Sequence, residues 1–311
     1  MKVLRWVLIV LFAASLLLLV PSEKVVAEEA SGGHIIDIPV EQTVMAPVNQ
    51  AFYTDNGYED PSLKITVSEG RAYDTDYMVI RVKIANPSQL RTSMWSTKGT
   101  GEERADKISA RDNAVLAING DSFRTNKPND TRKYIIRQCK DVFVQNWKND
   151  CYYDILFIDE NADMLILRNP TRPEVDAFVA EHKIINSFCF GPALVIDGER
   201  QQKPEQSIRA NGVGWTRDAQ RIALCQMGPL EYMIVVTGGP DCPNCTGITI
   251  DEFLDIIYTE GSPVTVYNLD GGNSAWVVLN NTKINSFGRV GGQGIRKITD
   301  IIYFASAWES D

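Results

Sequence analysis

Apolar and polar positions alternate, or gather in short apolar runs, along most of the chain after residue 60, and this pattern predicts a strand-rich domain. Residues 77–84 alternate polar and apolar positions, as a half-buried strand does. Residues 276–279 and 283–285, joined through an Asn-Asn pair, predict a hairpin. Compact apolar runs that predict further strands occupy residues 63–67, 114–118, 184–190, 193–196, 222–226, 232–237, 264–269 and 299–304.

Three segments predict helices, and the clearest is 250–260. Thr249 and Glu252 form a capping box before its apolar face, and Gly261 supplies the C-terminal stop. Residues 171–181 begin with a threonine cap and a proline in the first turn, and 102–112 predict a short helix.

Strand, helix and strand follow one another over residues 233–269, which predicts a βαβ-like unit. The sequence shows no internal repeat. We therefore expect a mixed α/β (α+β) fold: one strand-rich domain with a mixed sheet and a few packed helices.

The N-terminus has the pattern of a secretory signal. Lys2 and Arg5 precede an uncharged apolar run over 6–20, which is shorter than the ~20 residues that a spanning helix usually needs. Small residues ending at Ala27 offer a cleavage point, and an uncleaved membrane anchor is the alternative. Both interpretations place the rest of the chain outside the cytoplasm, secreted or held at the membrane only by this segment.

The remaining chain divides into two parts by its composition. Residues 28–60 are rich in glycine, proline and polar residues and predict a linker and irregular lead-in, whereas 61–308 predict the single domain. The chain has 31 basic and 40 acidic residues, a formal net charge of −9, and no basic cluster. This balance argues against nucleic acid or an anionic membrane surface as a partner.

Six cysteines in an exported chain permit disulfides. Cys139 and Cys151 flank a predicted hairpin, and a bridge between them would join its arms. Cys242 and Cys245 form a CxxC, for which a loop-closing disulfide is favoured over a zinc site or a redox centre, because the chain has only two histidines and Thr246-Gly247 separate the motif from the next helix.

Candidate chemistry lies where segments depart from their local patterns. The strand ending at Asn119 delivers an amide, Asp121 and Arg124 within a few residues, although an ordinary Asn-Gly turn is the alternative. The strand 264–269 delivers Asp270, and Gly271-Gly272 then allow the backbone to approach a ligand closely; a plain glycine turn is the alternative there.

Two further features are weaker by themselves. Gly191-Pro192 interrupts an apolar run, which is typical of a bulge or a turn. Arg221 and Arg296 stand in apolar company, where each could bind a phosphate in bidentate fashion or form a structural salt bridge.

Taken in order, these segments resemble the phosphodiester glycosidase family, most densely from residue 114 onward. The specific signature is Asn-Leu-Asp-Gly-Gly-x-Ser, present at 268–274. Further segments similar to the family's are Asn119-Gly120-Asp121-Ser122-Phe123, Phe190-Gly191-Pro192-Ala193-Leu194-Val195, Arg221-Ile222-Ala223-Leu224-Cys225-Gln226 and the late Arg296.

The resemblance implies an exported hydrolase that cleaves a sugar-1-phosphodiester linkage, of the N-acetylglucosamine-phosphate type, in a cell-surface or extracellular glycan. Asp270 would act on the anomeric carbon or on water, Asp121 is the second candidate, and Asn119 would hydrogen-bond the sugar. The phosphate and the rest of the substrate would contact Arg221, Arg296, Gly271, Gly272, Asn273, Ser274 and Gly191.

Two alternatives stay open: a glycan-binding module of the same fold without turnover, and a metal-dependent phosphodiesterase. The proposed hydrolysis requires no cofactor, although Asp121 with Asp270 could hold Ca²⁺ or Mg²⁺. The proposal requires that Asn119, Asp270, Arg221 and Arg296 line one shared cleft.

Overall fold

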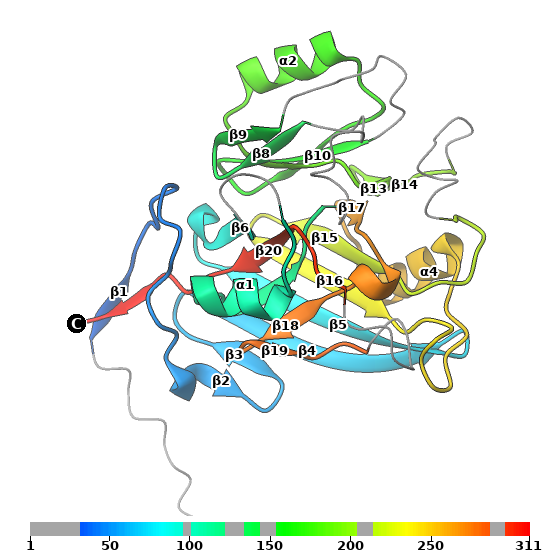
Figure 1. The fold of residues 1–311 in the computed structure, drawn as a ribbon, viewed down its shortest axis with the longest axis horizontal. Helices are drawn as coiled ribbons and strands as arrows, with labels where there is room; N and C mark the ends of the chain where they lie inside the picture. Colours follow the sequence, from blue (N-terminus) through cyan, green and yellow to red (C-terminus); the bar gives the residue numbers. More distant parts are fainter. Residues whose placement is uncertain (1–31, 96–100, 122–133, 144–153, 204–213, 287–295) are drawn as a thin grey trace, which may run out of the picture.

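The computed structural model describes residues 32–95, 101–121, 134–143, 154–203, 214–286 and 296–311 (Figure 1). Two sheets packed face to face form its main body. The larger sheet has the strand order β14 (Glu199–Arg200), β13 (Ala193–Ile196), β17 (Thr265–Asn268), β15 (Ile222–Gly228), β16 (Glu231–Thr237), β5 (Thr75–Ile84), β4 (Leu63–Ala72), β3 (Gly57–Glu59) and β2 (Tyr53–Thr54). The smaller has the order β19 (Thr282–Lys283), β18 (Val277–Leu279), β7 (Leu116–Asn119), β20 (Asp300–Phe304) and β6 (Leu90–Met94).

The central strands are apolar throughout because both of their faces are buried. In β7, Leu116 and Ile118 face the core between the two sheets, whereas Ala117 faces α1 (Ala105–Asp112) on the outer side of the smaller sheet. In β15, Leu224 faces the same central core and Ala223 faces α4 (Ile250–Glu260) on the outer side of the larger sheet. The body is therefore a four-layer α-β-β-α arrangement.

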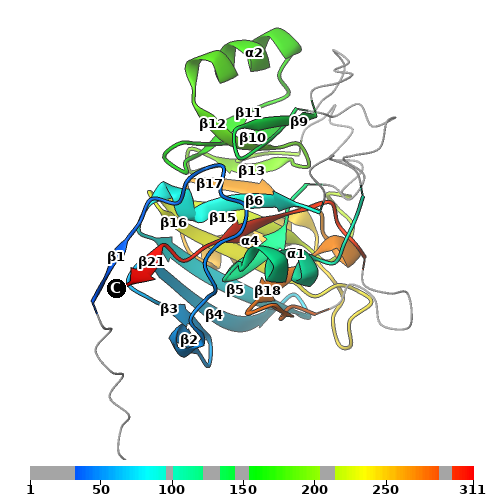
Figure 2. The ribbon, with the colours of Figure 1, turned by 60° about the vertical axis from the view of Figure 1, so that its left-hand side comes forward.

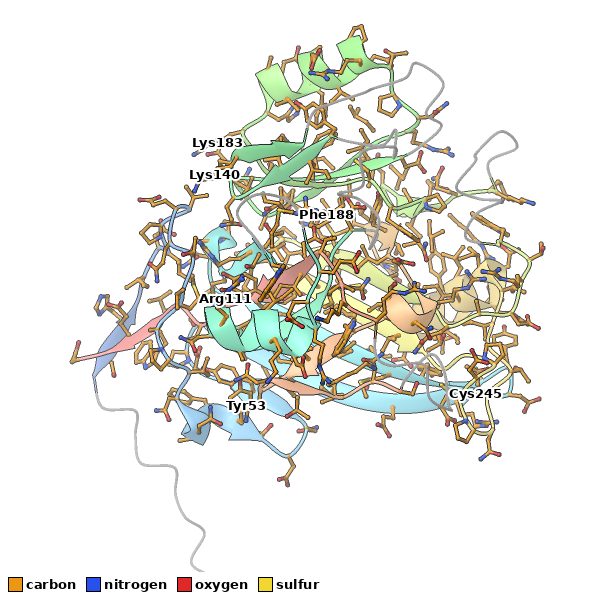
Figure 3. The ribbon with its side chains drawn as sticks, viewed as in Figure 1. Tyr53, Arg111, Lys140, Lys183, Phe188 and Cys245 are labelled. Carbon is orange, nitrogen blue, oxygen red and sulfur yellow. The ribbon has the colours of Figure 1, made fainter. Side chains whose placement is uncertain are left out.

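A smaller lobe rests on one side of this body (Figure 2). A three-stranded sheet, in the order β11 (Met164–Leu167), β10 (Ile155–Asp159) and β12 (Ile184–Phe188), packs against α2 (Arg172–Glu181) through its own apolar cluster. The hairpin of β8 (Ile135–Arg137) and β9 (Lys140–Phe143) lies beside β12. Figure 3 shows Phe188, at the end of β12, between the lobe and the body.

The remaining elements are short. They are β1 (Gly33–Ile35), which pairs with β21 (Trp308–Ser310), and the 3-10 turns η1 (Gln50–Phe52), η2 (Pro87–Gln89) and η3 (Gly272–Ser274). The segment expected to lead irregularly into the domain thus contributes β2 and β3 to the larger sheet. No helix among the described residues is both long and apolar enough to cross a bilayer.

The α+β class and the helix positions predicted from the sequence are confirmed. The helix α4 has the predicted bounds, because the Glu252 carboxylate accepts a hydrogen bond from the Thr249 backbone N–H at 2.8 Å while the Thr249 hydroxyl accepts one from Glu252 N at 3.3 Å. The same reciprocal cap between Thr171 and Glu174 begins α2.

The expected mixture of parallel and antiparallel pairing is not formed. Every strand pair among the described residues is antiparallel, because the crossover β16–α4–β17 steps over β15 rather than pairing its two strands. The unit over 233–269 is therefore a split βαβ, with β15 inserted between two strands that run in the same direction.

The described cysteines form no disulfide. Cys139 is a free thiol in the tight turn between β8 and β9, and its predicted partner, Cys151, lies outside the described residues. Cys245 is also a free thiol, and its Sγ atom lies 3.9 Å from Oδ2 of Asp76.

Candidate active site

The amide of Asn119 connects three segments at one end of the two sheets. Asn119 is the last residue of β7 and is fully buried. Its Nδ2 donates to the backbone carbonyl of Asp270 at 3.1 Å, and its Oδ1 accepts from the backbone N–H of Trp276 at 3.0 Å. The structure therefore brings together the two residues, 119 and 270, on which the predicted site depends.

The turn that carries Asp270 is held by backbone contacts to the start of β15. Leu269 N donates to Ile222 O at 2.9 Å, and Gly272 N donates to Gln220 O at 3.1 Å. Between them, a Cβ atom at Gly271 would lie 2.2 Å from Gln220 O. Gly271 thus allows the turn to lie close to another segment of the protein, at Gln220, and not only to a ligand. Gly272 has a φ of +56° and open space around it.

The two glycines are expected to respond differently to alanine. Gly271→Ala forces the turn away from Gln220 and should reduce turnover of a sugar-1-phosphodiester by about 10²-fold, since small displacements of positioning groups have costs of that order. Gly272→Ala meets no atom and should cost only the ~1–2 kcal/mol of left-handed backbone strain. Urea unfolding and steady-state kinetics of both variants check this; equal kinetic effects would contradict it.

A buried charged cluster lies directly beyond Asn119. Arg137 Nε donates to Asp300 Oδ2 at 2.9 Å, and Arg137 Nη2 lies 3.7 Å from Asp121 Oδ2. The carboxylate of Asp121 also accepts from Cys189 N at 2.9 Å, while its backbone N–H donates to Asp300 Oδ1 at 2.9 Å. All three side chains are at most 4% exposed. Two carboxylates thus share one guanidinium.

The two candidate carboxylates have different surroundings. The Asp121 carboxylate is buried, accepts a hydrogen bond from Cys189 N and lies beside the guanidinium of Arg137. Asp270 is only half-buried, at the tip of its turn. Sequence reasoning missed Arg137 and Asp300; the only signal for Arg137 was a charged residue at the end of the apolar run Tyr134-Ile135-Ile136.

The two predicted anion-binding arginines occupy different places. Arg296 Nη1 donates to the hydroxyl of Ser274 at 2.9 Å, and its backbone carbonyl accepts from Trp276 Nε1 at 3.1 Å, so it lies beside the Asp270 turn. Arg221 instead directs Nε to Ile248 O at 3.1 Å and Nη2 to Gly214 O at 2.8 Å.

Arg221 therefore holds the loops on the α4 side of the larger sheet. Burial lowers the pKa of Arg221 to about 10, which still leaves it charged at neutral pH. Its Nε and Nη2 atoms are directed at main-chain carbonyls, whereas Arg296 lies beside the Asp270 turn; the phosphate contacts expected of both arginines stay predictions.

The other predicted substrate contacts surround the same turn. Gly191 has a φ of +58°, and its carbonyl accepts from Asn268 Nδ2 at 3.0 Å. Asn273 is half-buried in η3, between Gly272 and the buried Ser274. Ser122, Phe123 and Arg124 lie outside the described residues. No group of three or more His, Cys, Asp or Glu side chains within the described ranges is placed to hold a metal ion.

Lys283 lies beside the indole ring of Trp276. Its Nζ lies 5.6 Å from the centre of the indole ring and donates to the carbonyls of Asn285 and Ser286 at 2.7 and 2.9 Å. Burial lowers the pKa of Lys283 to about 7. The folded protein thus disfavours the charged form of this lysine.

This shift predicts a pH dependence of stability. Between pH 7 and the unfolded lysine pKa near ~10.4, unfolding takes up a proton at Lys283, so the free energy of unfolding rises with pH by up to ~1.4 kcal/mol per unit. In Lys283→Met the part of the pH slope that comes from Lys283 should be absent. Loss of the hydrogen bonds to Asn285 and Ser286 lowers the free energy of unfolding equally at each pH. Urea unfolding at pH 7, 8 and 9, with the exposed Lys83→Met as control, measures the pH slope and the uniform loss of stability. If the free energy of unfolding changes with pH in the same way in wild type and Lys283→Met, the prediction is wrong.

A family model covers the part of the chain that carries these residues. The phosphodiester glycosidase family model matches residues 112–305, a span that contains Asn119, the Asp270 turn and Arg296. The chain belongs to the phosphodiester glycosidase family. No curated protein sequence matches it.

A solved structure shares the fold, and a second is similar to a lesser degree. The catalytic domain of zebrafish N-acetylglucosamine-1-phosphodiester alpha-N-acetylglucosaminidase, auto-inhibited by its pro-peptide, is similar with a TM-score of 0.60 at 15% identity, over 79% of this chain and 84% of that one. A hypothetical protein from Synechocystis is similar with a TM-score of 0.49 at 16% identity, over 78% of this chain and 62% of that one. At these identities the likeness concerns the fold alone.

Proposed function

We propose that this protein is an exported glycosidase that hydrolyses a sugar-1-phosphodiester of the N-acetylglucosamine-phosphate type in a cell-surface or extracellular glycan. The observation that carries the proposal is the contact between Asn119 and the Asp270 turn, which unites the family's two motif segments in one site. The choice of sugar follows the activity named for the zebrafish enzyme.

Hydrolysis at the anomeric carbon of a sugar-1-phosphodiester needs little general acid catalysis. A phosphate monoester is a good leaving group, so the anomeric C–O bond can break with its electron pair passing to the phosphate oxygen. The sugar carbon then becomes oxocarbenium-like and takes a hydroxyl from water. Asp270 is the carboxylate at the turn's tip that attacks this carbon or removes the water's proton.

The buried cluster supplies the electrostatic part. Among the described residues, Asp121 and Asp300 both face the guanidinium of Arg137, so this part of the site places two carboxylates against one cation near Asn119. A fixed negative charge stabilises a positive sugar carbon most strongly in a water-poor site. Arg296, hydrogen-bonded to Ser274, is the guanidinium that neutralises the departing phosphate.

Product identity tests this proposal directly. The purified full chain is incubated with N-acetylglucosamine-1-phosphomethyl diester, and with UDP-N-acetylglucosamine, in ¹⁸O-labelled water. Free N-acetylglucosamine carrying the label supports the proposal. Label in the phosphate, lost on adding a chelator, would indicate a metal-dependent phosphodiesterase, and saturable binding without products would indicate a binding module.

A further inference from the structure

A pocket of about 560 Å³ opens at the ends of β4, β5 and β16, facing the turn over 284–286. This volume falls within the ~300–1,000 Å³ typical of small-molecule sites. Its apolar floor is formed by Met78, Val236 and Ile284, and its polar rim includes Glu69 and Asp76. No predicted site residue lines it.

The pocket adjoins the Asp270 turn through Gln220. The Gln220 side-chain amide donates to Ser286 O, in the pocket wall, at 3.2 Å, while the Gln220 backbone carbonyl receives Gly272 N at 3.1 Å. On the other wall, the hydroxyl of Thr237 accepts from Arg221 N at 2.9 Å. A single residue thus connects the pocket to the turn that carries the carboxylate.

The same amide leaves an acceptor without a partner. Gln220 is 2% exposed, and its Oε1 makes no hydrogen bond to any described residue. A buried acceptor left in this state costs ~1–3 kcal/mol. Gln220 lies beside the pocket lining and not in it, so the lining residues are the ones that a ligand would contact.

The rim selects for hydrogen-bond donors without negative charge. Glu69 and Asp76 are carboxylates, which accept hydrogen bonds only. Among the described residues that line the pocket, the one guanidinium is that of Arg71, which is already directed at Asp76 Oδ1 at 2.6 Å and at Asn244 O at 2.9 Å. In this described lining a phosphate would meet two carboxylates and one engaged cation, whereas sugar hydroxyls can donate to the rim while the apolar face of the ring rests on the floor.

We infer that this pocket binds a second, uncharged saccharide unit of the substrate, next to the sugar whose phosphodiester is cleaved. The inference rests on the proposed function and adds to it a preference for glycan-sized substrates over small phosphodiesters. That unit can extend from either the phosphate side or the sugar side of the scissile bond.

Filling the pocket tests the inference. Ser286 is exposed, and it accepts hydrogen bonds from Gln220 and Lys283 through its backbone carbonyl, so Ser286→Trp fills the space and leaves those bonds in place. Ser68→Trp is the matched control, since Ser68 is an exposed serine on the opposite face of β4 from Glu69. The substrates are N-acetylglucosamine-1-phosphodiesters with a methyl or a methyl-glucoside aglycone, and a disaccharide-1-phosphomethyl diester.

We expect an extended substrate to have a kcat/KM about tenfold above the methyl compound in the wild type and in Ser68→Trp. Ser286→Trp should lose that advantage through KM while cleaving the methyl compound normally. The substrate that shows the advantage identifies the side from which the second unit extends. An advantage retained in Ser286→Trp, or absent from the wild type, overturns the inference and leaves the proposed function standing.

A second readout does not depend on turnover. Cys245 is a free thiol whose Sγ lies 3.9 Å from Asp76 at the pocket rim, and Figure 3 shows it at the end of β4 and β5, far from α2. Methyl glucoside or methyl N-acetylglucosaminide at millimolar concentration should slow maleimide labelling of Cys245 about threefold, followed by peptide mass mapping, and should leave Cys139 unaffected. Unchanged labelling with both saccharides contradicts the inference even if the enzyme proves inactive.

Discussion

Asp270→Asn is expected to lower kcat on N-acetylglucosamine-1-phosphomethyl diester by about 10²–10⁴-fold, with KM changed less than about threefold. The carboxamide has nearly the same shape, so it can still contact substrate, but it neither attacks the anomeric carbon nor takes a proton from water. Release of free sugar, followed by chromatography at saturating substrate, measures the effect.

The substitution changes the carboxylate and leaves the contact between Asn119 and the turn in place. The contact from Asn119 uses the backbone carbonyl of residue 270, so it does not depend on the carboxylate. Asp55→Asn, at an exposed position of the β2–β3 turn, is the control and should retain wild-type activity. Undiminished turnover in Asp270→Asn would remove this residue from the mechanism and transfer the role to Asp121.

Arg137→Met is expected to lower the free energy of unfolding by about 3–5 kcal/mol, the usual cost of removing one partner from a buried ion pair. Methionine can keep the contact with the Phe188 ring, over which the guanidinium carbon lies at 4.3 Å. What it cannot keep is the charge that Asp121 and Asp300 share. Urea denaturation of wild type and variant gives the difference.

Two further variants separate charge from packing. Arg81→Met removes a half-exposed arginine paired with Glu260 at 3.0 Å and should cost only ~0–1 kcal/mol. Adding Asp300→Asn to Arg137→Met should recover part of the loss, because one buried charge disappears. If the double variant is less stable than Arg137→Met alone, the cost is one of packing and not of charge.

Helix positions could be predicted from sequence because their signals are local. The cap of α4 involves Thr249 and Glu252, three residues apart, and the cap of α2 involves Thr171 and Glu174 with the same spacing. Strand positions were also evident from apolar runs. The pairing of the strands could not be predicted in this way, because β7 lies between β18 and β20, both of which follow it by more than 150 residues.

Some residues of the candidate site could be predicted from local sequence, and others could not. The segments containing Asn119 and Asp270 were identifiable, because amide, carboxylate and glycine residues follow directly on apolar strands. The partnership of Arg137 with Asp300 spans 163 positions and has no local signal. The side-chain direction of Arg221 was equally hidden, since an arginine before an apolar strand can turn toward a ligand or toward the main chain of a neighbouring loop.

The fixing of the Asp270 turn by main-chain atoms has a practical consequence. Hydrogen bonds from Leu269 N and Gly272 N, together with the Asn119 amide, hold the backbone on both sides of residue 270 through its main-chain atoms. An Asp270→Asn protein should therefore present an undistorted but inert receptor. Immobilised on a resin, it would retain intact glycans from culture medium long enough for mass spectrometry to reveal the natural substrate.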